Sequence, residues 1–402
     1  MPIRLATLSG DPEREPRLAA QLHARRDVKL VLRCVDRVEL LAAIRGGELD
    51  ALVSVGGAPW FDREAAAEAS NAAIRLVALT DDHREAERLS AFGAVVLMPD
   101  ATPTEVIETC RTSQIAVPTA ALNGQPAGSS GRVIGVWGPK GSPGRTSIAI
   151  EIGVQFGLDQ GDALLVDADT YGGDILQRVG ITEELPTIVW ASRMAAKDEL
   201  TAGTLFTQLR RVGERGPVVL PGLPRSELWP ELSEYGWRQL LQVVRALFKH
   251  TVFDVGFCLE SDPAPYPGPS EGRNRISRIT IREADQVVAV CRADPVGIKH
   301  FLWSFDDLRA LIDADRVLIV ANRVAPHSER EVGELLRRHL GKRPVAYVPN
   351  RPTEFGRSVF SGIPLGESGT GSDVSAAVRA VAAALGGKVR TRGLLTTLGG
   401  RK

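Results

Sequence analysis

A glycine-rich turn directly after an apolar run is the part of this sequence best suited to chemistry. Residues 133–147 (VIGVWGPKGSPGRTS) form a pattern typical of a buried strand, a turn and the start of a helix. Such a connection points backbone N–H groups and a helix N-terminus at one place, which favours a bound phosphate. Gly141, Ser142 and Gly144 are predicted to shape the turn. We therefore predict a nucleotide phosphate site here.

The residues that close the turn predict a bound metal ion, and one of them departs from the usual P-loop pattern. In a P-loop, a lysine reaches the terminal phosphates and the next Ser or Thr hydroxyl binds Mg²⁺. Thr146, followed by Ser147, stands at the hydroxyl position, but Arg145 occupies the lysine position. Arginine keeps the charge and can bind phosphate through two N–H groups, although it is larger and planar. The pattern predicts binding of ATP with Mg²⁺ and leaves open whether ATP is hydrolysed to ADP and phosphate.

Carboxylates follow two later apolar runs. The segment 164–174 (LLVDADTYGGD) carries Asp167 and Asp169, and the segment 251–256 (TVFDVG) carries Asp254. A carboxylate at the end of such a strand can hold the magnesium shell of a nucleotide. The alternative is that the first two are solvated aspartates at the end of a strand.

The elements that must position these residues alternate along the chain. In the second half, strands are expected at 133–137, 163–166, 218–220, 251–255, 286–291, 317–321 and 345–348, with helices at 146–156, 235–250, 296–312, 329–340 and 375–385. Parallel strands need crossovers of this length. In the first half, strands at 3–8, 28–34, 51–55, 76–80 and 94–98 alternate with helices at 17–26, 37–45, 64–71, 85–92 and 104–111. We predict an α/β protein with two doubly wound domains, the first flavodoxin-like and the second a P-loop NTPase with a mostly parallel sheet.

Composition narrows the function classes. The 49 Lys and Arg residues balance 49 Asp and Glu residues, so no overall basic field favours DNA or membrane binding. The four cysteines, at 34, 110, 258 and 291, form no close pair, which argues against a zinc or iron–sulfur site and fits a reducing cytosol. The N-terminal residues lack a signal-peptide pattern, and no apolar run is long enough to span a bilayer. A cytoplasmic location is expected.

The string 140–146 (KGSPGRT) resembles the deviant Walker A motif of the MinD/ParA family, which reads Lys-Gly-Gly-x-Gly-Lys-Thr. In that family the early lysine, here Lys140, crosses a dimer interface to the nucleotide of the partner. The resemblance implies that Asp167 lies near Mg²⁺, that Asp169 positions the attacking water and that Asp254 belongs to a Walker B strand.

Two later segments extend this resemblance to the base of the nucleotide. Residues 317–323 (VLIVANR) are similar to the strand whose terminal asparagine, here Asn322, lies by the adenine. Residues 347–350 (YVPN), with Pro349 and Asn350, resemble the loop on the other side of the base.

A receiver-like domain ahead of a MinD-like ATPase resembles the CpaE/TadZ family of Flp/Tad pilus assembly. The segments 218–224 (VVLPGLP) and 229–232 (WPEL) and the loop itself also resemble actinobacterial septum site-determining proteins. This resemblance implies a homodimer with a protein partner in pilus assembly or cell division. It leaves open which of these processes the protein serves. It therefore also leaves open whether the protein is located at a cell pole or at the septum.

The first domain departs from a working receiver. Phosphotransfer needs an aspartate at the end of the third strand and a lysine after the fifth, but residues 53–57 read VSVGG and residues 96–99 read VLMP. Thr80 does match the hydroxyl position of receivers, and Asp11 is expected to cap a helix or lie in a turn. We therefore predict a pseudo-receiver used for dimerisation or docking.

The expected domain limits are residues 1–112 for the pseudo-receiver, 113–131 for a linker, 132–387 for the ATPase domain and 388–402 for a basic tail. The tail offers little apolar surface, so a solvated segment and weak membrane association both remain open. Three functions stay open for the chain. The first is an ATP-dependent positioning switch, the second a nucleotide-binding scaffold that does not hydrolyse, and the third, disfavoured by the neutral charge, a ParA-like DNA partitioning factor.

Overall fold

The computed structural model describes residues 2–58, 60–112, 131–160, 162–183, 185, 187–260, 272–369 and 371–386. The described residues fall into two compact units, with 2–112 in the first and 131–260 and 273–386 in the second. The expected linker, apart from Gly131, and the expected basic tail lie outside the described residues.

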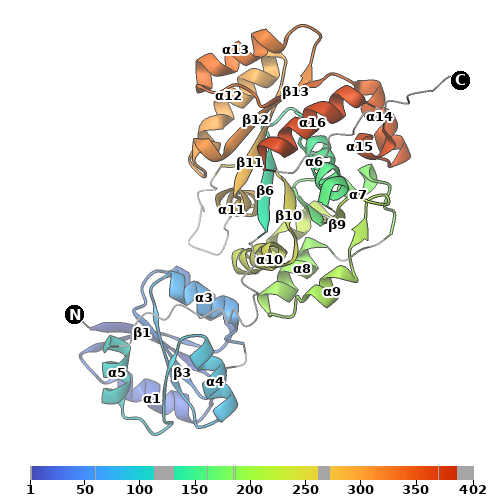
Figure 1. Ribbon diagram of the computed structural model, residues 1–402. Coiled ribbons are helices and arrows are strands. Elements are labelled where there is room, and N and C mark those ends of the chain that lie inside the picture. The colour runs from blue at the N-terminus through green and yellow to red at the C-terminus, as the bar shows by residue number, and fades with distance from the viewer. Residues whose placement is uncertain are drawn as a thin grey trace, which may run out of the picture. The chain divides into compact units, whose positions relative to one another are not determined.

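The first unit is a five-stranded parallel sheet with helices on both faces (Figure 1). Its strands follow the order β2-β1-β3-β4-β5, which is the order of flavodoxin-like folds. The elements are β1 (Ile3–Ser9), α1 (Arg14–His23), β2 (Val28–Cys34), α2 (Arg37–Arg45), β3 (Ala51–Val55), α3 (Arg63–Asn71), β4 (Arg75–Leu79), α4 (His83–Ala91), β5 (Val95–Leu97) and α5 (Pro103–Thr112). All five predicted strands and five predicted helices of this half are confirmed, with ends that differ by a few residues.

Apolar side chains on alternate strand positions form two cores in this unit, one for each face of the sheet. Leu5 and Val53 pack with α1 and α5, whereas Leu8 and Leu52 pack with α2, α3 and α4. Because successive side chains of a strand point to opposite faces, each strand serves both cores.

The second unit is built on an eight-stranded sheet with the order β13-β12-β11-β6-β10-β7-β9-β8. Its strands are β6 (Arg132–Trp137), β7 (Ala163–Ala168), β8 (Arg210–Arg211), β9 (Val218–Leu220), β10 (His250–Val255), β11 (Gln286–Arg292), β12 (Val317–Val324) and β13 (Ala346–Pro349). All adjacent pairs are parallel except β8 with β9. The mostly parallel sheet predicted from the sequence is confirmed.

Helices cover both faces of this sheet (Figure 1). One face carries α6 (Arg145–Gln160), α15 (Leu365–Ser368) and α16 (Ser372–Ala384). The other carries α8 (Ile188–Ala196), α9 (Ala202–Phe206), α10 (Glu234–Leu247), α11 (Arg275–Glu283), α12 (Pro295–Arg309) and α13 (Glu329–Leu340). The remaining helices are α7 (Ile175–Arg178) and α14 (Pro352–Ser361), with short 3-10 turns η1 (Ser226–Glu231) and η2 (Ala314–Arg316).

One sequence prediction in this unit needs correction, and one strand was not predicted. The helix expected over 235–250 ends at Leu247, and His250 is the first residue of β10, where its ring stacks on Phe156 at 4.2 Å between centroids. The two-residue strand β8 carries only exposed arginines, so no apolar pattern marks it in the sequence. No helix in the described part of the chain is both long and apolar enough to cross a bilayer.

The strand order places the expected site at a topological switch point. After β6 the chain continues to β7, which lies toward the β8 end of the strand order. After β10 it continues to β11, which lies on the other side of β6, toward β13. Connections that leave in opposite directions open a crevice outside the carboxyl ends of the strands, where ligands of such sheets bind. The glycine-rich turn leaves β6 at this point.

Candidate functional site

The turn between β6 and α6 is a tight loop with several residues at positive φ. Gly141, Ser142 and Gly144 have φ of 98°, 53° and 96°, and α6 begins immediately afterwards at Arg145. The N-terminus of this 16-residue helix therefore lies at the carboxyl end of the sheet, with N–H groups unpaired within the helix. All three turn residues expected from the sequence have positive φ, and their role in binding phosphate stays a prediction.

Neighbouring strands brace the turn from outside. Asn322, buried at the end of β12, donates from Nδ2 to the Pro143 carbonyl at 2.7 Å, and its Oδ1 accepts from the Arg323 N–H at 2.9 Å. Arg292, the last residue of β11, donates to the Gly141 carbonyl at 2.9 Å. Asn322 thus supports the turn in this structure, and its expected position beside adenine stays a prediction.

Asp167 and Asp254 face each other on adjacent strands. They are direct partners in the parallel register of β7 and β10, so both side chains point to the same face of the sheet, toward α6. Both are buried, with exposures of 2% and 1%. Thr146, in the first turn of α6, hydrogen-bonds Asp254. The structure brings together the three residues expected to bind Mg²⁺.

Burial shapes the electrostatics of this pair. Desolvation raises the pKa of Asp254 to about 6, against the opposing effects of Arg145 and Thr146. Burial and the neighbouring Asp254 also raise the pKa of Asp167 well above its ordinary range. Two buried carboxylates at one place resist ionising together. The pair is therefore a strong attractor for a cation.

The hydrogen bonds of the two carboxylates leave an oxygen of Asp254 free to bind a metal ion. Asp167 accepts from the N–H groups of Ile175 at 3.1 Å and Asp169 at 3.3 Å, whereas Oδ1 of Asp254 is buried without a hydrogen-bond partner. Hard oxygen donors of this kind suit Mg²⁺. Among the described residues no cluster of three His, Cys, Asp or Glu side chains has the geometry of a metal site. Since Mg²⁺ is commonly held by one or two carboxylates together with phosphate, these residues fit a nucleotide-bound ion.

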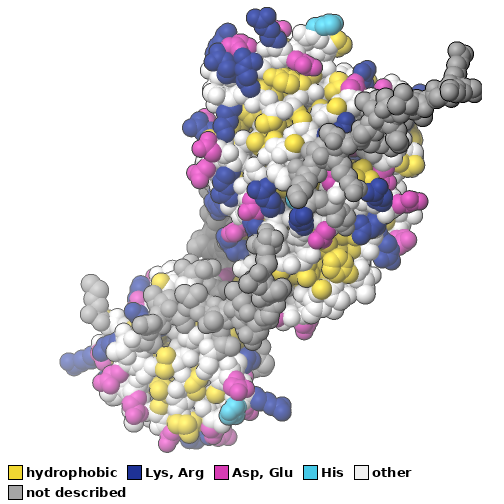
Figure 2. All heavy atoms as spheres, in the orientation of Figure 1, with side chains coloured by type: hydrophobic (Ala, Val, Ile, Leu, Met, Phe, Trp, Pro, Cys, Tyr) yellow, Lys and Arg dark blue, Asp and Glu magenta, His cyan; other side chains and the backbone are white. Residues whose placement is uncertain are grey.

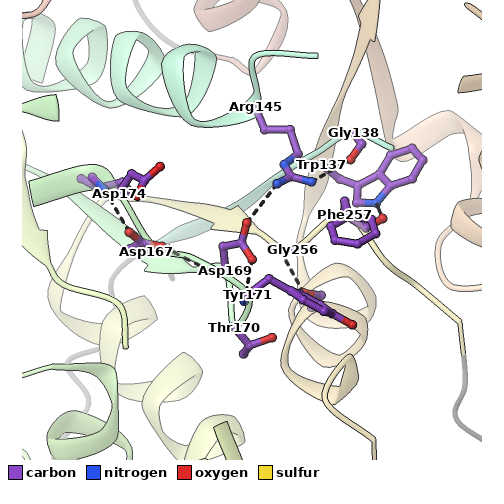
Figure 3. A network of polar contacts seen from close by, with 12 residues as sticks. Trp137, Gly138, Arg145, Asp167, Asp169, Thr170, Tyr171, Asp174, Gly256 and Phe257 are labelled. Atoms are coloured by element: carbon purple, nitrogen blue, oxygen red, sulfur yellow. Dashed lines mark hydrogen bonds and ion pairs between the residues drawn. The ribbon is translucent and has the colours of Figure 1, made fainter. Parts of the chain in front are cut away.

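Arg145 lies within the same cluster but binds protein groups (Figure 3). Its Nη1 donates to the Gly138 carbonyl at 3.0 Å, and its Nη2 forms an ion pair with Oδ2 of Asp169 at 2.9 Å. The guanidinium also lies 5.9 Å from the centre of the Phe257 ring. The sequence left open where this side chain points, and the structure directs it at Asp169.

The remaining predicted residues lie around the same edge of the sheet. Lys140 is exposed at the start of the turn, and Ser147 is half-buried in the first turn of α6. Pro349 ends β13, and the following Asn350 is exposed, with its N–H bound to the Val324 carbonyl at 3.0 Å. All of the predicted site residues thus belong to β6, β7, β10, β12, β13 or the connections that follow them.

Sequence reasoning missed several residues that shape the site. Phe257, just after β10, contacts Arg145 and accepts a hydrogen bond from Trp137 Nε1 at 3.0 Å through its carbonyl. Arg292 contacts the turn, and Tyr171 contacts Asp169. Only the position of Phe257 and Arg292 at strand ends signals such roles, because their contacts join segments that are distant in the sequence.

No family model and no curated protein matches the sequence. Solved structures do match. A ParA family ATPase from Chlorobium tepidum has 16% identity and a TM-score of 0.53, over 63% of this chain and 98% of that one. A McdA variant from Cyanothece in complex with ATP has 16% identity and a TM-score of 0.51, over 66% and 100%. The septum site-determining protein MinD of Pyrococcus horikoshii, in complex with Mg-ADP, has 16% identity and a TM-score of 0.48, over 63% and 95%.

The first two matches span nearly the whole of each neighbour, and at this level of identity they establish fold and no more. The glycine-rich turn, the carboxylate pair and the sheet order lie in a fold shared with those proteins. The chain contains the α/β fold of the ParA-type P-loop ATPases.

Proposed function

We propose that this chain binds ATP with Mg²⁺ and acts as a nucleotide-dependent positioning switch. The observation that carries the proposal is the meeting of a phosphate-cradling turn with the buried Asp167–Asp254 pair at the switch point of the sheet. Gly141, Ser142, Gly144 and the first turn of α6 would hold the phosphates. Thr146, Asp167 and Asp254 would hold the ion, which supplies charge neutralisation between phosphate and carboxylates.

The resemblance to MinD and ParA proteins supports a finer proposal for the output. ATP would join two copies of the chain, with Lys140 of each reaching the nucleotide of the other, and the dimer would bind a partner of the pilus-assembly or septum machinery. Lys140 is exposed and forms no ion pair within the described residues, so its charge is available to a second copy. We assign residues 132–387 to this ATPase domain and residues 1–112 to a pseudo-receiver that docks partners.

Binding and assembly together test this proposal. We expect calorimetry with ATP and Mg²⁺ to show saturable binding, and light scattering to show a nucleotide-dependent dimer. The Lys140→Ala variant should bind ATP as a monomer with little change in affinity, but should not dimerise. Lys249→Ala is the matched control, since Lys249 is exposed just before β10, at the amino ends of the strands and away from the proposed site. Absence of ATP binding in the unaltered chain would refute the proposal.

The Arg145–Asp169 ion pair favours a second candidate, a nucleotide-binding scaffold that does not hydrolyse. Asp169 is the residue expected to position the attacking water, and its Oδ2 is engaged by Arg145. A general base must reach the water that it orients. We expect ATP binding with phosphate release near background, and a gain of turnover in Arg145→Lys that the Arg145→Lys/Asp169→Ala double variant loses. Turnover by the unaltered chain that is lost in Asp169→Ala would instead establish a cycling switch.

Surface charge gives a DNA partitioning role no support. Figure 2 shows side chains of both signs interspersed on the visible face of each unit. Near the end of α13, Arg337 and Arg343 share the carboxylate of Glu334, and Lys342 pairs with Asp315. Nucleic-acid binding by charge alone requires unpaired cations along a continuous surface.

A further inference from the structure

Asp169 is held from two sides by contacts that the proposed nucleotide site does not itself require. On the first side, Arg145 binds its Oδ2 at 2.9 Å, and both side chains are largely shielded, with exposures of 14% and 9%. An ion pair removed from water interacts more strongly than a surface pair, and loss of one partner leaves an unpaired buried charge. The contact therefore determines where the Asp169 carboxylate lies in the nucleotide-free chain.

On the second side, the residues after Asp169 are clamped by Arg273 and Asn274, the two residues just before α11. Arg273 donates to the Thr170 carbonyl from Nε at 3.1 Å and from Nη2 at 2.8 Å, and lies 4.2 Å from the centre of the Tyr171 ring. The Tyr171 hydroxyl donates to Oδ1 of Asn274 at 2.8 Å. The segment between Asp169 and Tyr171 is thus joined to α11, far along the sequence.

One hydrogen bond links the two sides. The Tyr171 N–H donates to Oδ1 of Asp169 at 2.9 Å, while Arg145 occupies Oδ2 of the same carboxylate (Figure 3). A movement of this carboxylate must therefore stretch or break the bond to the Tyr171 amide. That amide reports directly on whether Arg145 holds Asp169.

A bound phosphate would compete for Arg145. Arg145 is the first residue of α6, and it closes the turn in which the phosphates would lie. Arginine forms its strongest contacts as a planar fork to a single anion, and a phosphate carries more charge than a carboxylate. The hydrogen bond to the Gly138 carbonyl, at 3.0 Å, keeps the guanidinium beside the turn.

We propose that Arg145 is a positioning residue that exchanges Asp169 for a nucleotide phosphate, and that this exchange releases Asp169 and loosens the clamp of Arg273 and Asn274 on Thr170 and Tyr171. The inference rests on the proposed ATP binding and adds how occupancy of the site is passed to α11. A nucleoside triphosphate acts in this scheme both as ligand and as competitor for an internal ion pair.

Hydrogen–deuterium exchange on the full chain tests this exchange of partners, with a non-hydrolysable ATP analogue and Mg²⁺ as the probe. In the unaltered chain the analogue should make the Tyr171 amide exchange roughly tenfold faster or more, the scale of losing one charge-assisted hydrogen bond. Arg145→Ala should show this faster exchange without nucleotide. Arg145→Lys, which can reach one anion but not fork to two groups, should retain analogue binding and show partial protection of that amide.

Arg337→Ala is the matched control, because this substitution removes an arginine ion pair outside the proposed site, the one with Glu334 on α13. It should leave the Tyr171 amide protected until the analogue binds. Circular dichroism of each variant checks folding, and Arg145→Lys keeps the test valid if Arg145→Ala does not fold.

A titration of the analogue in the same samples separates the two proposals. Binding without any change at the Tyr171 amide would overturn the exchange of partners and leave ATP binding intact. Equal protection of that amide in Arg145→Lys and the unaltered chain, with and without the analogue, would also overturn it. Failure of the unaltered chain to bind the analogue would refute ATP binding itself.

Discussion

The Gly144→Ala variant is expected to bind nucleotide about 100-fold more weakly than the unaltered chain. Gly144 has φ of 96°, outside the range that an alanine adopts without strain, and an added Cβ would lie 2.3 Å from Nδ2 of Asn322. Asn322 would have to move and abandon the buried Pro143 carbonyl that it binds at 2.7 Å. Backbone strain and the lost hydrogen bond together cost on the order of 3 kcal/mol. If the turn opens to relieve this strain, it must be closed again to bind nucleotide, and the affinity falls about 100-fold.

Calorimetric titration of ATP with Mg²⁺ measures this loss, and Gly172→Ala supplies the control. Gly172 lies just after Asp169, but a Cβ added there meets no atom within 4 Å. We expect its affinity to stay within about twofold of the unaltered chain. Equal affinities for Gly144→Ala and the unaltered chain would show that the turn is not the nucleotide site.

The Asp254→Asn variant is expected to be more stable than the unaltered chain when no metal or nucleotide is present. Burial raises the pKa of Asp254 to about 6, so the native state binds its proton more tightly than the unfolded state does. The free energy of unfolding therefore falls as pH rises from the ordinary aspartate pKa to the raised one, and stays low above it. Asparagine carries no charge and escapes this loss, for a gain on the order of 1–3 kcal/mol at about pH 8.

Denaturant unfolding in EDTA at about pH 5 and about pH 8 measures the effect. The gain should be much smaller at about pH 5, where most of the Asp254 carboxyl in the unaltered chain is already protonated. With ATP present, added Mg²⁺ should stabilise the unaltered chain but not Asp254→Asn. A variant that is less stable than the unaltered chain at about pH 8 without metal would contradict our account of the buried pair.

Asp167 explains why the effect should be large at this position. It is the register partner of Asp254, is itself buried, and has a raised pKa for the same reason. Removing one of two crowded carboxylates relieves desolvation and repulsion together. The cost of keeping both in the native chain is consistent with a site built to receive a cation.

Most elements of the fold follow from local pattern. Apolar runs and helical stretches identified the strands and the longer helices, because burial on a sheet or on one helix face imposes a short repeat on the sequence. Strand β8 and helices α7, α8, α9, α11, α14 and α15 were not predicted from the sequence. Of these, β8, α7, α9 and α15 are too short to carry a complete repeat. The glycine turn was visible because only certain residues tolerate the backbone angles of Gly141 and Gly144.

The sequence by itself determined that a glycine-rich turn precedes acidic strand ends, and in what order. Only the tertiary structure decided that Asp167 and Asp254 face each other, that Asn322 braces the turn and that Arg145 pairs with Asp169. The partners in these contacts belong to different strands or loops, and sheet order and register bring them together. Spacing along the chain encodes local backbone conformation, whereas the choice of partner for a charged side chain depends on which groups lie within reach after folding and how far water is excluded from them.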